Sequence, residues 1–204
     1  NAVNEEGESI DFHSGAKVGD LKFVDVNGDG FISDDDKTYI GDPIPDFTMG
    51  FNLGFNYKNF DFNTSAYASI GNDMVRDYER QAAGVNRGTY MYERWRGEGT
   101  SNTVPRASDG SSINNMNFSD FYVEDASYLR IQNVQLGYTA NESLTSRFGM
   151  DSLRMYLSVN NLFTFTNYYG FDPSASSGSP IGAGIDKGFY PVSRSFLLGL
   201  NIKI

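Results

Sequence analysis

The feature that most constrains the fold of this chain is a run of residues that alternates between apolar and polar side chains. In FTMGFNLGFNY the apolar positions are Phe47, Met49, Phe51, Leu53, Phe55 and Tyr57, and Thr, Gly or Asn occupies each position between them. Side chains alternate between the two faces of a β-strand, so the run predicts a strand with one apolar face. A length of about ten residues is that of a strand that crosses a membrane.

Four further segments show the same period. FDFNTSAYASI follows a two-residue turn and completes a predicted β-hairpin over residues 46–71. SYLRIQNVQLGY and LRMYLSVNNLFTF predict two strands within 128–166, and SFLLGLNIKI predicts a final strand within 193–204. The apolar phase shifts between Ile131 and Val134, which indicates a β-bulge.

The fold class expected from these segments is all-β, with five adjacent antiparallel strands in chain order. Five strands cannot close a large barrel, so the two edges must pair with other polypeptide. The side chains expected to point outward include Phe47, Phe51, Leu157, Leu198 and Leu200.

The connections between the strands favour a transmembrane barrel. The links at Lys58-Asn59 and NESLTSRFGMD are short, whereas residues 1–45, 72–127 and 167–192 are long. Short periplasmic turns and long extracellular loops alternate in this way in membrane barrels, and such long loops are uncommon in compact soluble domains. The 16 Phe and 13 Tyr also favour a membrane barrel, because lipid-facing β-surfaces carry aromatic girdles.

A soluble β-sandwich with one wet face would show the same alternation. The alternative function is therefore that of a secreted, calcium-stabilised β-domain for adhesion or carbohydrate binding. The two alternatives differ in whether the apolar side chains face lipid or form a shared core.

The stretch DVNGDGFISDDD, residues 25–36, has the spacing of a calcium-binding loop. Its expected ligands are Asp25, Asn27, Asp29, the backbone carbonyl of Phe31, Ser33 and Asp36. The last position is Asp where an EF-hand has a bidentate Glu, so Mg²⁺ is possible beside Ca²⁺. An Asx- and Gly-rich surface turn without an ion is the other interpretation.

Charge and composition exclude several classes of function. A net charge of −10 argues against a nucleic-acid-binding patch, which needs clustered Lys and Arg. The sequence has no cysteine and one histidine, so histidine-based triads and zinc clusters lack parts, and no enzyme is expected.

Aromatic and arginine side chains cluster in the long segment 72–127. Such residues stack on sugars or anchor protein interfaces, and they also pack loops onto their neighbours. The candidate contact residues are Tyr90, Tyr92, Arg94, Trp95 and Arg96, with Tyr169 from residues 167–192.

Several blocks of this sequence resemble the SusC/RagA family of TonB-linked outer-membrane transporters. They are GDLKFVDVNGDGFISDDDKTYIGDPIPDFTMGFNLGFNYKNFDF, YVEDASYLRIQNVQLGYT, VNNLFTFTNYYGFDP and YPVSRSFLLGLNIKI, in this order over roughly residues 17–204. The resemblance implies the C-terminal antiparallel strands of a plugged barrel of about 22 strands. It implies localisation in the bacterial cell outer membrane.

The resemblance also implies a function and its partners. That family imports glycans or oligopeptides, works with a SusD-like lipoprotein lid and draws energy from TonB. The expected partners are the remainder of the barrel and the plug, the lid, outer-membrane lipid, and TonB through an N-terminal part that this sequence lacks. On this interpretation, residues 1–45 are an extracellular lead-in that a bound ion would order.

Overall fold

The computed structural model describes residues 2–3, 9–10, 15–80, 88–107, 114–175 and 180–204. The chain divides into two compact units, which are considered separately below. The first comprises Asn1–Gly41 and Arg76–Val123, and the second comprises Asp42–Val75 and Glu124–Ile204.

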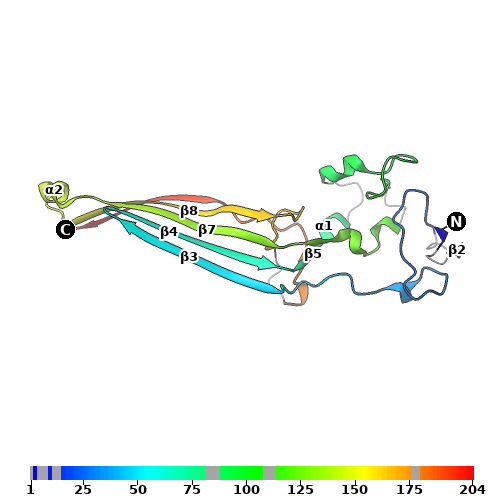
Figure 1. Ribbon diagram of the computed structural model, residues 1–204. Helices are drawn as coiled ribbons and strands as arrows, with labels where there is room; N and C mark the ends of the chain where they lie inside the picture. The colour runs from blue at the N-terminus through cyan, green and yellow to red at the C-terminus, as the bar shows by residue number, and fades with distance from the viewer. Residues whose placement is uncertain (1, 4–8, 11–14, 81–87, 108–113, 176–179) are drawn as a thin grey trace. The chain divides into compact units, whose positions relative to one another are not determined.

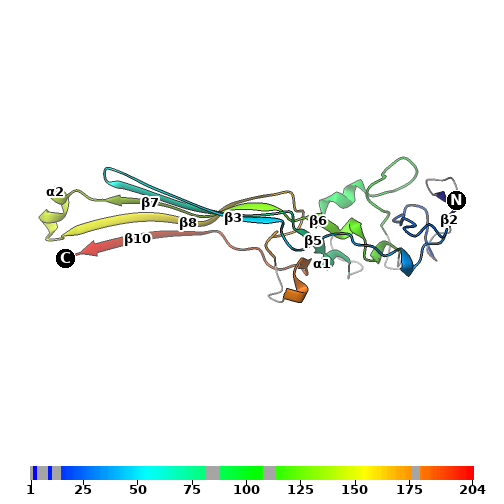
Figure 2. The same ribbon diagram turned by 60° about the horizontal axis from the view of Figure 1, so that its bottom comes forward.

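The second unit is built on one antiparallel sheet of five strands in the order β10-β8-β7-β4-β3 (Figure 1). The strands are β3 (Phe47–Tyr57), β4 (Phe60–Ile70), β7 (Tyr128–Thr139), β8 (Ser152–Thr166) and β10 (Ser195–Lys203). Figure 2 shows β10 beside β8 at one edge of this single layer. The predicted order of five antiparallel strands is confirmed, and so is the all-β fold class; the sheet of this segment does not close into a barrel.

The register of the sheet separates its side chains into two faces. Phe51 pairs with Ala66 and Ala66 with Ile131, while Leu136 pairs with Leu157 and Leu157 with Leu198. Positions one residue away pair polar with polar, as Asn52 does with Ser65. Because every pair keeps the same phase, one face is apolar across all five strands and the other is mainly polar.

A β-bulge keeps the two faces in phase where the sequence pattern slips. Ile131 and Asn133 of β7 pair with the consecutive residues Ala66 and Ser65 of β4, so Gln132 is the extra residue. The shift lies between Ile131 and Val134, as the sequence predicts. On both sides of the bulge the apolar residues of β7 lie on the same face, because the unpaired Gln132 compensates for the change of phase.

The two ends of the sheet differ in their connections, which are short at one end and long at the other. At the turn end, β3 and β4 are joined by Lys58 and Asn59, and β7 and β8 by α2 (Glu142–Thr145) and η5 (Ser146–Phe148). The loop end is where the two long segments after β4 and β8 leave the sheet. Figure 1 shows α2 at the turn end.

Short elements make up the long segments. The segment after β4 contains β5 (Asp73–Arg76) and β6 (Val123–Asp125), and that after β8 contains β9 (Ile185–Asp186); these form a sheet of order β6-β5-β9. The others are β1 (Ala2–Val3), β2 (Ser9–Ile10), η1 (Asp34–Asp36), α1 (Asp77–Arg80), η2 (Thr89–Glu93), η3 (Asn114–Met116), η4 (Asp120–Tyr122) and η6 (Pro180–Gly182). Among the described residues, no helix has the length and apolar character needed to cross a membrane.

An ion pair crosses three strands on the polar face near the turn end. Arg154 of β8 donates from Nε to Asp61 Oδ1 at 2.9 Å and from Nη2 to Asp61 Oδ2 at 2.5 Å. Gly137 of β7 lies between them, and a Cβ there would approach Arg154 Nη2 to 2.6 Å. The missing side chain of Gly137 therefore provides the space through which the guanidinium reaches the carboxylate.

We expect Gly137→Ala to destabilise the full-length protein by about 1–3 kcal/mol, because the added methyl group would collide with this ion pair. The matched control is Gly50→Ala on the same face of β3, where an added Cβ would meet nothing within 4 Å. The free energy of unfolding of both variants is measured by urea unfolding from lipid vesicles, monitored by circular dichroism. Equal stability of the two variants would show that Gly137 is not needed for the pair.

Candidate functional site

The loop at residues 25–36 is held by carboxylates that accept backbone hydrogen bonds. Asp25 Oδ1 accepts from the N–H of Gly28 at 2.7 Å, and Asp25 Oδ2 accepts from the N–H of Gly30 at 2.8 Å. Gly28 and Gly30 have φ angles of 76° and 85°, which glycine adopts without steric cost. The two glycines therefore permit the tight path that turns these N–H groups toward Asp25.

Asp36 closes the loop from its other end. Its Oδ1 accepts from the N–H of Val26 at 2.9 Å, and its Oδ2 accepts from the N–H of Ser33 at 2.7 Å. Ser33 caps η1 through its side chain, which accepts from the N–H of Asp35. The N–H of Ser33, and then those of Val26 and Asn27, hold the pKa of Asp36 below 3.8, because they stabilise the carboxylate.

The middle of the loop is braced by Asn27 and Asp29. Asn27 Nδ2 donates to Asp29 Oδ2 at 3.1 Å, and Asp29 Oδ1 accepts from the N–H of Phe31 at 2.9 Å. Within the described ranges, no three or more acidic, His or Cys side chains form a group that could hold a metal ion, so Asp25, Asp29 and Asp36 are not gathered around one point.

The donor chemistry of the loop nevertheless suits a hard cation. The six expected ligands would all contribute oxygen, which is what Ca²⁺ and Mg²⁺ prefer. A carboxylate that accepts one backbone hydrogen bond per oxygen still has further lone pairs. The residues therefore fit an ion in type and order, and binding would require the three carboxylates to converge.

Two of the aromatic contact candidates pack inside the first unit. The indole of Trp95 lies against Gly19, where an added Cβ would stand 2.6 Å from its Cδ2 atom. The Tyr90 ring meets Phe121 edge-on at 6.3 Å between centroids, and the Arg76 guanidinium lies 5.0 Å from the Tyr90 centroid. These rings stabilise the loop from within.

The other candidates of the segment 72–127 are more accessible. Tyr92 is 76% exposed and Arg96 is also exposed, with Arg96 Nη2 donating to the Tyr92 carbonyl at 2.9 Å. Arg94 is half-buried and donates from Nη1 to the Met91 carbonyl at 3.1 Å. The arginine candidates thus brace η2, and Tyr92 presents the most exposed ring of the cluster.

A partly buried cluster of polar side chains, which the sequence pattern does not predict, joins the lead-in to the same segment. Asp20 Oδ1 lies 2.7 Å from Arg106 Nε and accepts from Asn115 Nδ2 at 2.9 Å. Asn115 Oδ1 in turn accepts from the N–H of Leu21 at 2.7 Å. Partners separated by 86 and 95 residues leave no local signal in the sequence.

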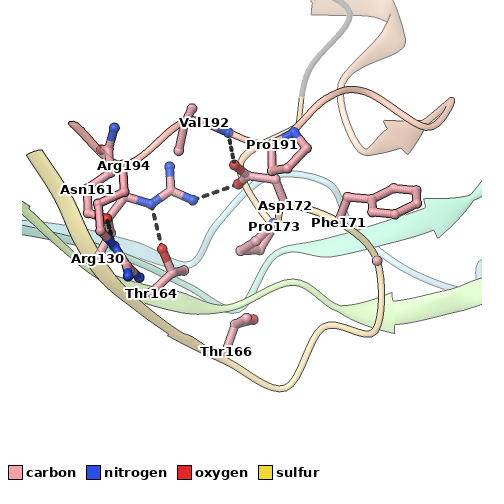
Figure 3. Close-up of a pocket in the computed structure, with 11 residues that line it drawn as sticks. Arg130, Asn161, Thr164, Thr166, Phe171, Asp172, Pro173, Pro191, Val192 and Arg194 are labelled. Carbon is pink, nitrogen blue, oxygen red and sulfur yellow. Dashed lines mark hydrogen bonds and ion pairs between the residues drawn. The ribbon is translucent and has the colours of Figure 1, made fainter.

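A second missed cluster lies on the polar face of the sheet at its loop end (Figure 3). Arg130 of β7 donates from Nη2 to Asp172 Oδ1 at 2.6 Å, and both side chains are less than a tenth exposed. Burial raises the pKa of Asp172, but hydrogen bonds from Ser174 and Val192 outweigh it and hold the pKa below 3.8. The Asp172 carboxylate therefore stays ionised at neutral pH, beside the Arg130 guanidinium.

A hollow of about 320 Å³ adjoins this pair. Its walls come from β7, β8 and the segment after β8, and they include Arg130, Thr164, Asp172 and Arg194. Several of its polar groups are already satisfied by one another, since Arg130 Nε donates to Thr164 Oγ1 at 2.9 Å. Tyr169 lies in the same segment, is 61% exposed, and donates its backbone N–H to Glu124 Oε2 at 2.8 Å.

The chain is similar to curated TonB-dependent receptors, although no family model matches it. It is 39% identical over 189 residues to TonB-dependent receptor P3 of Formosa agariphila, which covers 89% of this chain and 18% of that receptor. It is 35% identical over 184 residues to TonB-dependent receptor SusC of Bacteroides thetaiotaomicron, with 89% and 17% covered.

Solved structures give the same relationship. The RagAB peptide importer in its open-open state superposes with a TM-score of 0.68 at 28% identity, over 86% of this chain and 19% of that one. The chain is a SusC/RagA-like segment. This SusC/RagA-like segment spans about a fifth of the length of the relatives it matches.

Proposed function

We propose that this SusC/RagA-like segment is part of an outer-membrane, TonB-dependent active transporter of oligopeptides or glycans. The relationship to TonB-dependent receptors supports the transport class. The description of RagAB as a peptide importer supports oligopeptides as cargo. The proposal gives the segment no catalytic role.

The observation that carries the proposal is the exposure of the apolar face of the sheet. Phe51, Leu157 and Leu198 come from three different strands and are 52%, 47% and 81% exposed. Aromatic rings pair toward both ends of that face, with Phe60 and Tyr138 at the turn end and Phe163 and Phe165 at the loop end. Lipid would cover such a face, and aromatic girdles mark its two boundaries in membrane barrels.

The secreted β-domain remains a worse fit to the same observation. A sandwich buries its apolar face against a second sheet about 10 Å away. In the part of the chain that the structure describes, the apolar side chains of β3 are exposed along its whole length.

Leu197 and Leu198 provide a matched test, because they are adjacent leucines on opposite faces of β10. We expect Leu198→Arg to destabilise the full-length protein in lipid vesicles by about 2–4 kcal/mol, the cost of a cation facing the bilayer midplane. Leu197 pairs with Ser158 on the polar face, so Leu197→Arg should cost much less.

Urea unfolding in vesicles measures both variants, and insertion into native outer membranes gives a second reading. Equal losses in the two variants would contradict a lipid-facing apolar side. A larger loss for Leu197→Arg would place lipid on the other face.

We further propose that a SusD-like lipoprotein meets the long segments 72–127 and 167–192. A standard interface needs about 800 Å² from each partner, which segments of this length can supply. The exposed rings of Tyr92 and Tyr169 are of the residue type that dominates binding energy at interfaces.

Variants of Tyr92 and Tyr90 distinguish contact with the lipoprotein from packing within the loop. We expect Tyr92→Ala to weaken co-purification of the lipoprotein with the full-length transporter by about tenfold, without loss of stability. Tyr90→Ala should destabilise the loop instead, because its ring packs on Phe121. Unchanged lipoprotein binding by the Tyr92 variant would remove that ring from the interface.

We also propose that residues 25–36 bind one Ca²⁺ or Mg²⁺ as a structural ion. Its ligands would be Asp25, Asn27, Asp29, the Phe31 carbonyl, Ser33 and Asp36. The reason lies in the like charges of the loop, since an ion would offset the repulsion that opposes the convergence of the three carboxylates. The order of donors and the turns at Gly28 and Gly30 support this.

Hydrogen exchange over residues 25–36 of the full-length protein tests the ion. Added Ca²⁺ should slow exchange relative to a chelated sample, and Asp29→Ala should abolish that difference while the strands stay protected. Asp35→Ala is the matched control, because it removes an equal charge from a position outside the ligand set. Equal exchange with Ca²⁺ and with chelator would contradict a structural ion.

A further inference from the structure

The connection between β8 and β10 takes a route that its two ends do not require. β8 and β10 are antiparallel neighbours, which a few residues could join. Instead, residues 167–175 and 180–194, called the strap below, contact β5 and the residues that precede β3 before the chain enters β10. β3 is the strand at the opposite edge of the sheet from β10. Every contact described below lies within the second unit.

The strap is fastened first to the polar face of β7. Arg130 contacts Asp172 Oδ1, and it also donates from Nη1 to Ser174 Oγ at 2.9 Å. Arg130 pairs in register with Tyr67 of β4 and Thr164 of β8, which places it on the polar side of the sheet. Figure 3 shows Asp172 and the Arg130 guanidinium joined over the strands.

The strap is fastened again beyond β4. The Gly184 carbonyl accepts from the N–H of Val75 in β5 at 2.7 Å. Gly184 also approaches Pro43, which precedes β3, so closely that an added Cβ would stand 2.5 Å from the Pro43 Cβ atom. The strap thus extends from the end of β8 past β7 and β4 to the entry of β3.

Two carboxylates hold the path in place. Asp186 is fully buried and accepts from Tyr168 Oη at 2.8 Å, which ties the outward run of the strap to its return. Asp172 Oδ2 accepts from the N–H of Val192 at 3.0 Å, so one carboxylate binds Arg130 and the return run together. Buried charges that are paired in this way are costly to separate.

We propose that the strap is a fixed constriction across the polar side of the sheet at its loop end, and that Arg130 is the positioning residue that holds it there. This rests on the proposed function, because residues that face lipid alternate with residues that face the interior of a membrane barrel, so the polar face would line the aqueous path of the cargo. A solute that enters from the loop end would then pass the strap before it reaches the polar residues below. The strap would exclude solutes by size.

The test uses two cysteine sites in full-length protein that carries no other cysteine. Tyr190→Cys bears a nitroxide, because Tyr190 is 91% exposed on the strap and its label reports the mobility of the strap. Ser65→Cys lies on the polar face further from the loop end, paired with Asn133. This cysteine is modified with a small methanethiosulfonate and with a bulky polymer-linked maleimide. Comparing the two rates shows whether the size of a reagent limits its access past the strap.

We expect Arg130→Gln and Asp172→Asn each to increase nitroxide mobility and to raise the rate of bulky modification at Ser65→Cys by about tenfold or more. The small reagent should react at an unchanged rate. The double variant should match either single variant, because both remove one interaction. Arg130→Lys keeps the ion pair and should restore most of the size discrimination.

Arg154→Gln is the matched control, because it breaks an ion pair on the same face near the turn end and should alter neither readout. A more mobile strap with unchanged bulky modification would overturn the constriction. An unchanged nitroxide spectrum in Arg130→Gln would overturn the positioning role. If Ser65→Cys reacts with neither water-soluble reagent in any variant, the polar face is not aqueous, and the proposed function fails together with the strap.

Discussion

The structure depends on one constraint, which is that the phase of side chains is kept across five hydrogen-bonded strands. A slip of one residue in any strand would move its apolar side chains to the polar face. The bulge at Gln132 shows how strictly the phase is kept, because the extra residue of β7 is left unpaired and the faces stay separate. The exposed apolar face, the ion pair over Gly137 and the contacts of the strap with the polar face all depend on this separation.

Local patterns were sufficient to predict the strands and the bulge. Alternation at Phe47–Tyr57 is a property of neighbouring residues, and so is the change of phase after Ile131. The ligand order of the calcium-type loop is local as well, and its Asp25 and Asp36 hydrogen bonds follow from the same short stretch. Whether an ion binds there depends on how far the carboxylates can converge, which the pattern does not contain.

Pairs between distant residues were beyond the sequence pattern. Asp61 and Arg154 are 93 residues apart, and only the register of β4, β7 and β8 brings them together across Gly137. The same holds for Arg130 and Asp172, which are 42 residues apart. Trp95 illustrates the limit for single residues, because its type suits both a contact surface and the packing against Gly19 that the structure shows.

The most direct test of the account is a nitroxide scan of β3 from Thr48 to Asn56 in the full-length protein in lipid bilayers. Accessibility to oxygen, which concentrates in lipid, is compared at each position with accessibility to a water-soluble nickel chelate. We predict oxygen maxima at Met49, Phe51, Leu53 and Phe55, and nickel maxima at the residues between them, since the register assigns these sets to opposite faces. Accessibility without a two-residue period, or with the two phases exchanged, would contradict a lipid-facing apolar side.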